Sequence, residues 1–253
     1  MIPYWPQPRF QVCSHTLYAF GVLLTSALIV GSIVFICFAR KSGLNPKIAA
    51  VMVAIGVPIG LLGSHLWYCA IEDRGALLEF GGIASFGGIF STLSVLCACV
   101  FIAERDFSEK LPRWLDAAFV AFSVTAAMSR LGCFMAHDHP GPLTNSWLGV
   151  KFPDGTRYDL ALLEFMFWCI VCGINLAFHR SKISKQGGML WGGVAIVYGL
   201  FRLWADANQE YLAVSSSPLV LRLPTILLIA LGVGFVIRPW ISNLDETKAM
   251  PCA

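Results

Sequence analysis

Charged residues are scarce in this chain. Only 13% of its 253 residues are Asp, Glu, Lys or Arg, whereas a soluble domain usually carries about 25%. The net charge of +3 is small, and no basic cluster or aromatic-interleaved groove accompanies it, so the sequence gives no support for nucleic-acid binding. Hydrophobic residues make up 57% of the chain and the mean hydropathy is +0.70. These values predict a polytopic membrane protein.

Several other features are missing. The first eleven residues contain one basic residue, Arg9, so the basic region that opens a cleavable signal peptide is not found. No two apolar segments repeat visibly, which argues against an inverted-repeat transporter. No soluble domain fits between the apolar segments, so we expect a single transmembrane domain over residues 1–253.

The cysteines do not form a recognisable metal or redox motif. Cys169-x-x-Cys172 lies within an apolar run with no histidine beside it, which favours two small packing residues over a redox pair. Cys133-x-x-x-His137-x-His139 contains metal-ligand types. Because no fourth ligand stands at a recognised spacing, we predict neither a metal site nor a cofactor.

The predicted fold is all-α, with about seven transmembrane helices. A helix needs about 20 residues to cross the apolar core of a bilayer. The segments that reach or approach this length are 16–38, 48–70, 83–103, 114–136, 160–178, 188–204 and 218–238. The longest connection, 137–159, is rich in glycine and proline and is predicted to be turns.

The loops that should face the cytoplasm are identified by their basic residues. On one side we find Arg40, Lys41, Lys47, Arg105, Lys110, Arg113, Arg180, Lys182, Lys185, Arg238 and Lys248. The other side has only Arg9, Arg74, Lys151 and Arg157. The first side should therefore be cytoplasmic, which places the N-terminus outside and the C-terminus inside.

Polar residues inside the predicted spans gather at one depth. An arginine in the bilayer core costs roughly 2.5–3.5 kcal/mol on insertion scales, so it is retained for a partner or a task. The polar residues near the outer ends of the spans are Arg130, Arg202, Asp206, Arg222, Glu164, His65, His15, Tyr18 and Ser85. The inner halves contain almost none, which predicts an arginine-rich cavity in the outer leaflet that is open to an anionic ligand.

Simpler interpretations of these residues stay open. Arg222 is near enough to its span end to extend to the lipid headgroups. Arg202 and Asp206 are four residues apart and suit a structural ion pair as well as a functional one. Glu164 is either neutral or paired with an arginine. The glycines of 81–88 favour close helix packing or a close backbone approach to a ligand.

Ordered motifs resemble one family, bacterial prolipoprotein diacylglyceryl transferase. Its core signature Gly-Arg-Leu/Ile-Gly-Asn-Phe, with an acidic residue beyond, is similar to Ser129–Phe134 followed by Asp138. Its Gly-Gly…Ser…His-Gly-Gly segment resembles Gly81–Gly88, and its late Gly-Tyr-Gly-x-x-Arg-x-x-x-Glu helix resembles Val197–Asp206. A Tyr-Gly in the first span has Tyr18-Ala19 as its nearest match. The family has seven spans with the N-terminus outside, which agrees with the topology predicted above.

The chain departs from the family at several positions. The histidine between the serine and the glycine pair is Phe86 here, and the asparagine of the core signature is Cys133. The His-Pro-x-Gln-x-Tyr-Glu element is reduced to Tyr158–Glu164. The arginines and acidic positions remain.

The resemblance implies transfer of the diacylglyceryl group of phosphatidylglycerol to the lipobox cysteine of prolipoproteins, forming a thioether. It also implies a multi-pass protein of the bacterial inner (plasma) membrane whose partners are membrane lipid and the prolipoprotein signal peptide. Phosphate or lipid contacts are expected from Arg130, Arg202, Tyr18, Ser85, Gly87 and Gly88. The residues expected to serve catalysis are His137, Asp138, His139, Arg202 and Asp206.

The proton acceptor has to be a group other than Phe86. Histidine titrates in the right range, so His137, His139 and His15 are the candidates, with Asp138 as the orienting group. A rival hypothesis is a lapsed relative that binds an anionic lipid or lipoprotein without transfer. A small-solute transporter fits less well, because the polar groups stay in one leaflet.

Overall fold

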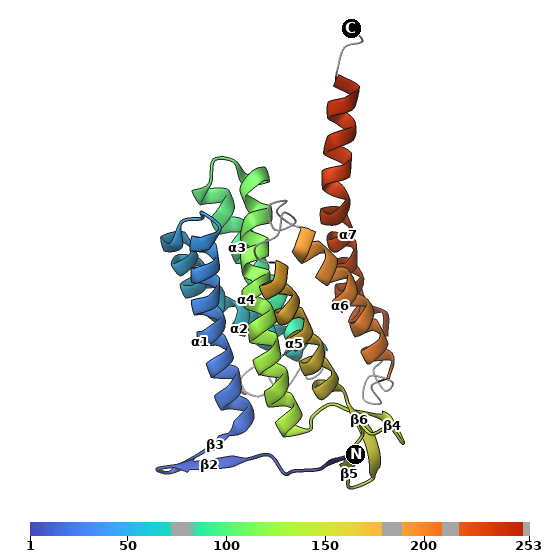
Figure 1. The fold of residues 1–253 in the computed structure, drawn as a ribbon. Coiled ribbons are helices and arrows are strands. Elements are labelled where there is room, and N and C mark those ends of the chain that lie inside the picture. The colour runs from blue at the N-terminus through green and yellow to red at the C-terminus, as the bar shows by residue number, and fades with distance from the viewer. Residues whose placement is uncertain (72–81, 83, 179–188, 209–217, 250–253) are drawn as a thin grey trace. The chain divides into compact units, whose positions relative to one another are not determined.

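The computed structural model describes residues 1–71, 82, 84–178, 189–208 and 218–249 (Figure 1). Seven helices account for most of these residues, as the sequence predicts. They are α1 (Ala19–Lys41), α2 (Pro46–Ile71), α3 (Ser85–Ala103), α4 (Phe107–Ala136), α5 (Leu160–Phe178), α6 (Met189–Ala207) and α7 (Pro218–Ala249). The predicted residues Arg74, Gly81, Ile83, Arg180, Lys182 and Lys185 lie outside the described part.

Among the residues that the structure describes, five helices are long and apolar enough to cross a membrane. They are Ala19–Lys41, Pro46–Ala70, Ser85–Ala103, Phe107–Ala136 and Leu160–Ala177. Large side chains on these helices, such as Ile33, Leu62 and Ile170, are more than half exposed, as expected where lipid replaces water. The chain is therefore a multi-pass membrane protein.

Local signals set the first helix boundaries. Gly43 adopts a φ of 72°, and the Leu44 N–H donates to the Ala39 carbonyl at 2.9 Å, which closes α1 with a Schellman turn. Asn45 then accepts the Lys47 N–H at 3.0 Å, with Pro46 as the first residue of α2. This is the usual pairing of an Asn cap with proline at the first helical position.

Strands were not predicted, and the structure contains two small sheets. The first has the order β1-β5-β6-β4, from β1 (Ile2–Pro3), β4 (Pro140–Leu143), β5 (Val150–Phe152) and β6 (Gly155–Asp159). The second pairs β2 (Arg9–Val12) with β3 (His15–Tyr18). Span one was expected from residue 16, but the helix begins at Ala19 because His15–Tyr18 is paired as a strand.

The larger sheet ties the N-terminus to the long connection. Ile2 pairs with Val150 in parallel, and its N–H donates to the Gly149 carbonyl at 2.8 Å. The turn between β5 and β6 uses Gly155 at a φ of 137°, a conformation that side chains rarely adopt. The glycines that were interpreted as a turn-rich loop thus include the turn of a hairpin.

The chain forms two compact units: residues 1–31 with 122–253, and residues 32–121. In the second unit, α2 and α3 pack through glycines. A Cβ at Gly87 would clash with the Gly63 carbonyl, and one at Gly88 would clash with the Ser64 hydroxyl. Close helix packing therefore accounts for Gly87 and Gly88.

Candidate functional site

Arg130 lies in the first unit, about two turns before the end of α4. Only 8% of the residue is exposed. Its Nε pairs with Oε2 of Glu164, which lies on α5. A buried guanidinium keeps its charge, and it needs a carboxylate beside it to offset the loss of hydration.

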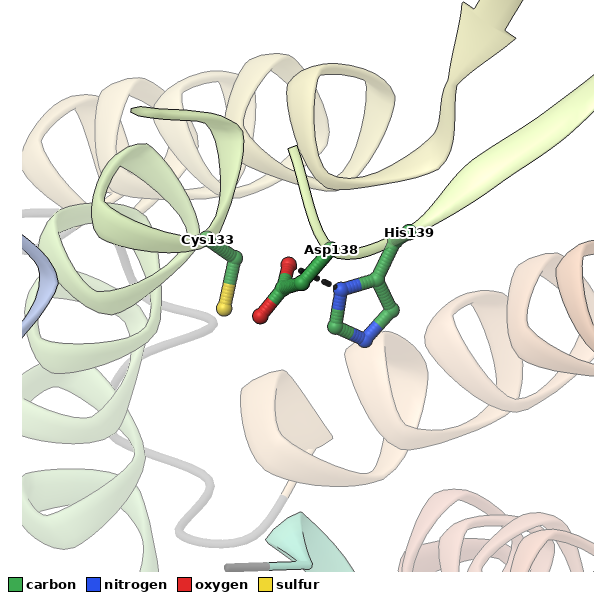
Figure 2. A group of neighbouring side chains, drawn as sticks. All are labelled: Cys133, Asp138 and His139. Carbon is green, nitrogen blue, oxygen red and sulfur yellow. Dashed lines mark hydrogen bonds and ion pairs between the residues drawn. The ribbon is translucent and has the colours of Figure 1, made fainter. Parts of the chain in front are cut away.

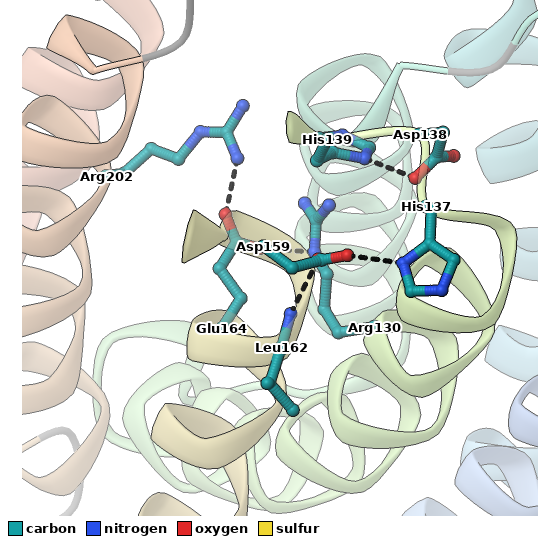
Figure 3. Close-up of polar contacts among 8 residues, drawn as sticks. All are labelled: Arg130, His137, Asp138, His139, Asp159, Leu162, Glu164 and Arg202. Atoms are coloured by element: carbon teal, nitrogen blue, oxygen red, sulfur yellow. Dashed lines mark hydrogen bonds and ion pairs between the residues drawn. The ribbon is translucent and has the colours of Figure 1, made fainter. Parts of the chain in front are cut away.

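Glu164 binds a second arginine with its other oxygen. Oε1 accepts from Nη1 of Arg202, on α6, at 2.5 Å, and Glu164 itself is 1% exposed. Arg202 also pairs through Nε with Oδ1 of Asp206 at 2.9 Å. Figure 3 shows the Arg202 guanidinium above the Glu164 side chain and Arg130 to its right. Two guanidinium groups and two carboxylates from three helices thus form one charge-balanced arginine cluster: Arg130, Glu164, Arg202 and Asp206.

Aromatic rings stand beside the arginine cluster on α5 and α6. Tyr198 is 5% exposed, and its ring lies 4.7 Å from that of Trp168. Phe167 stacks on Phe201 at 5.2 Å. These rings exclude water from the neighbourhood of the ion pairs, which strengthens the attraction between opposite charges there.

Replacing Glu164 should destabilise the fold. Glu164→Gln keeps the shape but leaves two buried arginines facing a neutral amide, and breaking a buried pair costs about 3–5 kcal/mol. We expect a clear fall in the thermal midpoint of the purified protein in detergent. Glu109→Gln, at an exposed position of α4, is the matched control and should change stability by less than about 0.5 kcal/mol. Equal midpoints for the two variants would contradict a supporting role for Glu164.

His137 ends α4 and is held in a structural contact. Its φ of 51° and its N–H bond to the Phe134 carbonyl at 3.2 Å turn the chain back over the helix. Nδ1 contacts Oδ2 of Asp159 at 2.8 Å, with the side chains 4% and 0% exposed. Tyr4 stacks on the imidazole with ring centroids 4.5 Å apart.

Asp159 joins this contact to the start of α5. Its Oδ1 accepts the Leu162 N–H at 3.2 Å, which caps the helix that carries Glu164. Burial raises the pKa of Asp159, while the hydrogen bond with His137 opposes the rise. The His137–Asp159 pair therefore fixes α4 and α5 relative to each other, and the enclosed imidazole is poorly placed to meet a substrate.

His139 and Asp138 form a second, more accessible pair. Nδ1 of His139 contacts Oδ1 of Asp138 at 2.5 Å, with the side chains 24% and 45% exposed. The two side chains lie beside the arginine cluster, since His139 interacts electrostatically with Glu164 and Asp138 with Arg130. Figure 3 shows the His139 ring beside the Asp138 carboxylate. Of the two histidines on this segment, His139 combines a carboxylate partner with a partly exposed side chain.

The structure also describes the surroundings of the other predicted site residues. Tyr18 is 46% exposed at the end of β3, with Arg9 placed 5.5 Å above its ring, and His15 is exposed on the same strand. Ser85 and Phe86 begin α3 in the second unit. Phe86 stacks on Phe90 with centroids 6.3 Å apart.

Sequence reasoning did not identify two features of the site. It left open whether Glu164 is neutral or paired with one arginine, and the structure pairs it with two. It did not single out Asp159, although an aspartate directly before an apolar helix is a recognisable cap signal. The pairing of Asp159 with His137 across 22 residues has no local signature.

Comparisons with known proteins agree on one family. The model of the prolipoprotein diacylglyceryl transferase family matches residues 8–238. A phosphatidylglycerol–prolipoprotein diacylglyceryl transferase from Listeria monocytogenes serotype 4a is 25% identical over 249 residues, covering 90% of this chain and 87% of its own. Enzymes of the same name from Symbiobacterium thermophilum and Halalkalibacterium halodurans are each 23% identical, and cover 76% and 91% of this chain and 76% and 84% of their own.

Proposed function

Because this chain belongs to the prolipoprotein diacylglyceryl transferase family, we propose that it transfers the diacylglyceryl group of phosphatidylglycerol to the lipobox cysteine of prolipoproteins. The cysteine sulfur attacks the glycerol carbon that bears the phosphate. A carbon–sulfur bond forms, the carbon–oxygen bond breaks, and glycerol phosphate leaves. The proton of the thiol passes to a base. The partners are membrane phosphatidylglycerol and the signal peptide of the prolipoprotein.

The observation that carries this proposal is the pair of arginines held by Glu164. Negative charge grows on the leaving phosphate, so the reaction needs cations already in place. Arg130 and Arg202 suit this task, because a guanidinium grips phosphate oxygens through two parallel bonds and stays charged when desolvated. Glu164 and Asp206 hold the two arginines in position before the lipid arrives.

His139 is our candidate for the base. If its Nδ1 carries the proton donated to Asp138, its Nε2 is the acceptor that a thiol requires. Attack needs a thiolate, since a free thiol with a pKa near 8.5 is mostly protonated at neutral pH. This assignment leaves Asp138 as the orienting group and gives His137 a structural task.

Lipid contacts outside the arginine cluster are assigned to Tyr18 and Ser85. Both are exposed and lie next to the start of a helix. Helix packing already explains Gly87 and Gly88, so we assign them to the support of α3.

The alternative, an inactive relative that binds lipid or lipoprotein without transfer, is less well supported than an active transferase. The relatives that match most of the chain are named as transferases, and the arginines and acidic groups that the reaction needs are intact. Phe86 removes one histidine, but the His139–Asp138 pair offers a replacement for proton transfer.

We further propose that the chain is one transferase-like domain with seven spans in the bacterial inner membrane, the N-terminus outside and the C-terminus cytoplasmic. A reporter active only in the cytoplasm should give signal when fused after Arg40, Arg105, Arg180 or Lys248. Fusions after Arg74, Asn145 or Glu210 should be silent. Signal from two of these last three would reverse the orientation. The expectation rests on the excess of basic residues in one set of loops.

The reaction is tested by release of its small product. Purified protein in phosphatidylglycerol vesicles should liberate glycerol phosphate when given a lipobox peptide with one cysteine. No release should follow when that cysteine is serine, because the hydroxyl is a far weaker acid than the thiol. Lipid binding without release for either peptide would favour the lapsed alternative. If the wild type releases no glycerol phosphate, the Phe86→His variant tests whether the family histidine alone restores transfer.

A further inference from the structure

Three metal-ligand side chains meet at the end of α4. Cys133 lies in the last turn of the helix, and Asp138 and His139 follow the reversal at His137. The Cys133 sulfur, a carboxylate oxygen of Asp138 and a ring nitrogen of His139 all lie within 4.8 Å of one another. Figure 2 shows the three side chains converging. The sequence spacing gave no reason to include Asp138, because the backbone turn that brings it to Cys133 is not visible in the sequence.

We propose that Cys133, Asp138 and His139 form a binding site for a zinc-like divalent cation. Thiolate and imidazole ligands select Zn²⁺ over Mg²⁺ or Ca²⁺. Three protein ligands leave the fourth tetrahedral position to water, as in zinc sites that are not purely structural. One thiolate and one carboxylate balance the two positive charges of the ion, which limits its repulsion by Arg130.

The geometry allows the three ligands to close on an ion. With metal–ligand bonds of about 2.0–2.3 Å, the ligand atoms of a tetrahedral site lie roughly 3.3–3.8 Å apart. The present separations are at most 4.8 Å, so the ligand atoms need to move by no more than about 1–1.5 Å to reach this geometry. Asp138 and His139 follow the helix end and are 45% and 24% exposed, so their side chains have room to rotate. Cys133 is 7% exposed and provides the fixed ligand.

The site would act as an inhibitory switch on the proposed transfer, and this consequence rests on the proposed function. A bound ion takes up a ring nitrogen of His139 and the carboxylate of Asp138 that orients it, and therefore prevents His139 from accepting the thiol proton. It also places a cation beside Arg130, which contacts Cys133. Metal binding and transfer should exclude each other.

The binding test uses Co²⁺ as a spectroscopic probe of the full chain, purified in detergent after treatment with a chelator. We expect about one Co²⁺ per chain with a thiolate-to-cobalt charge-transfer band, displaced by Zn²⁺. Cys133→Ser should abolish the band. Asp138→Asn and His139→Gln should each weaken Zn²⁺ binding by at least about 10-fold. Cys172→Ser is the matched control, since Cys172 lies on α5 against Ser123, and it should change nothing. A band that survives Cys133→Ser, or the lack of any band in the wild type, would overturn the site.

A second variant separates the metal site from the proposed activity. Cys133→Asn places the asparagine of the family signature here, removes the soft ligand and keeps a polar contact for Arg130. We expect transfer by the wild type to fall at least 10-fold in saturating Zn²⁺, and transfer by Cys133→Asn to be insensitive to it. Equal inhibition of both proteins would overturn the switch. If neither protein transfers, the proposed function fails while the Co²⁺ measurement still decides the site.

Discussion

Arg130→Ala should abolish transfer. The variant removes the cation that meets the leaving phosphate, and it also leaves Glu164 with Arg202 alone. Losing one preorganised group aimed at developing charge costs about 10²–10³-fold in rate, and Arg130 is one of only two arginines in the cluster. The measurement is the initial rate of glycerol phosphate release at saturating peptide.

Arg130→Lys distinguishes the role of the guanidinium from that of charge. A lysine keeps the positive charge but loses the planar fork, so we expect no rescue. Arg222→Ala, at an exposed position of α7, serves as the matched control and should be milder. Normal transfer and lipid binding by Arg130→Ala would mean that the buried arginine is structural.

His139→Gln should lower the transfer rate by about 10²–10⁴-fold, the usual contribution of a positioned base. Binding of phosphatidylglycerol should change little, because Arg130 and Arg202 are intact. The wild-type rate should fall when the solution is acidified, since a protonated imidazole accepts no proton. The variant should lose this step in the pH–rate profile.

His137→Gln provides the contrast. It breaks the buried contact with Asp159, so we expect a lower thermal midpoint, with the pH step kept in the protein that remains folded. If His137→Gln removes the step and His139→Gln keeps it, the base is His137 and not His139, and our assignment is wrong.

The helices were predictable because their signal is local. Each apolar run in the sequence became a helix, and the boundary at Gly43 and Asn45 follows from residues that favour those positions. The strands were not predictable, because the residues that pair are far apart in the sequence, as Ile2 and Val150 are. Short strands also carry too few residues for an alternating pattern to appear.

The sequence predicts that the residues of the site share one depth, but it does not predict which of them form ion pairs. Counting residues along the spans placed Arg130, Glu164 and Arg202 at one level of the bilayer. It could not show that Glu164 lies between the two arginines, because the rotation of each helix about its axis is set by packing. His137 and His139 looked equivalent in sequence. The left-handed conformation of His137 directs one imidazole toward Asp159 and leaves the other beside Asp138.

The most direct test of transfer is the mass of the acceptor peptide. A lipobox peptide with a single cysteine would be incubated with the wild-type chain and phosphatidylglycerol of defined acyl chains. Our account predicts a mass increase equal to one diacylglyceryl group on that cysteine, held by a thioether that hydroxylamine does not cleave, and no increase with Arg130→Ala. An unmodified peptide, from protein that still binds phosphatidylglycerol, would contradict it.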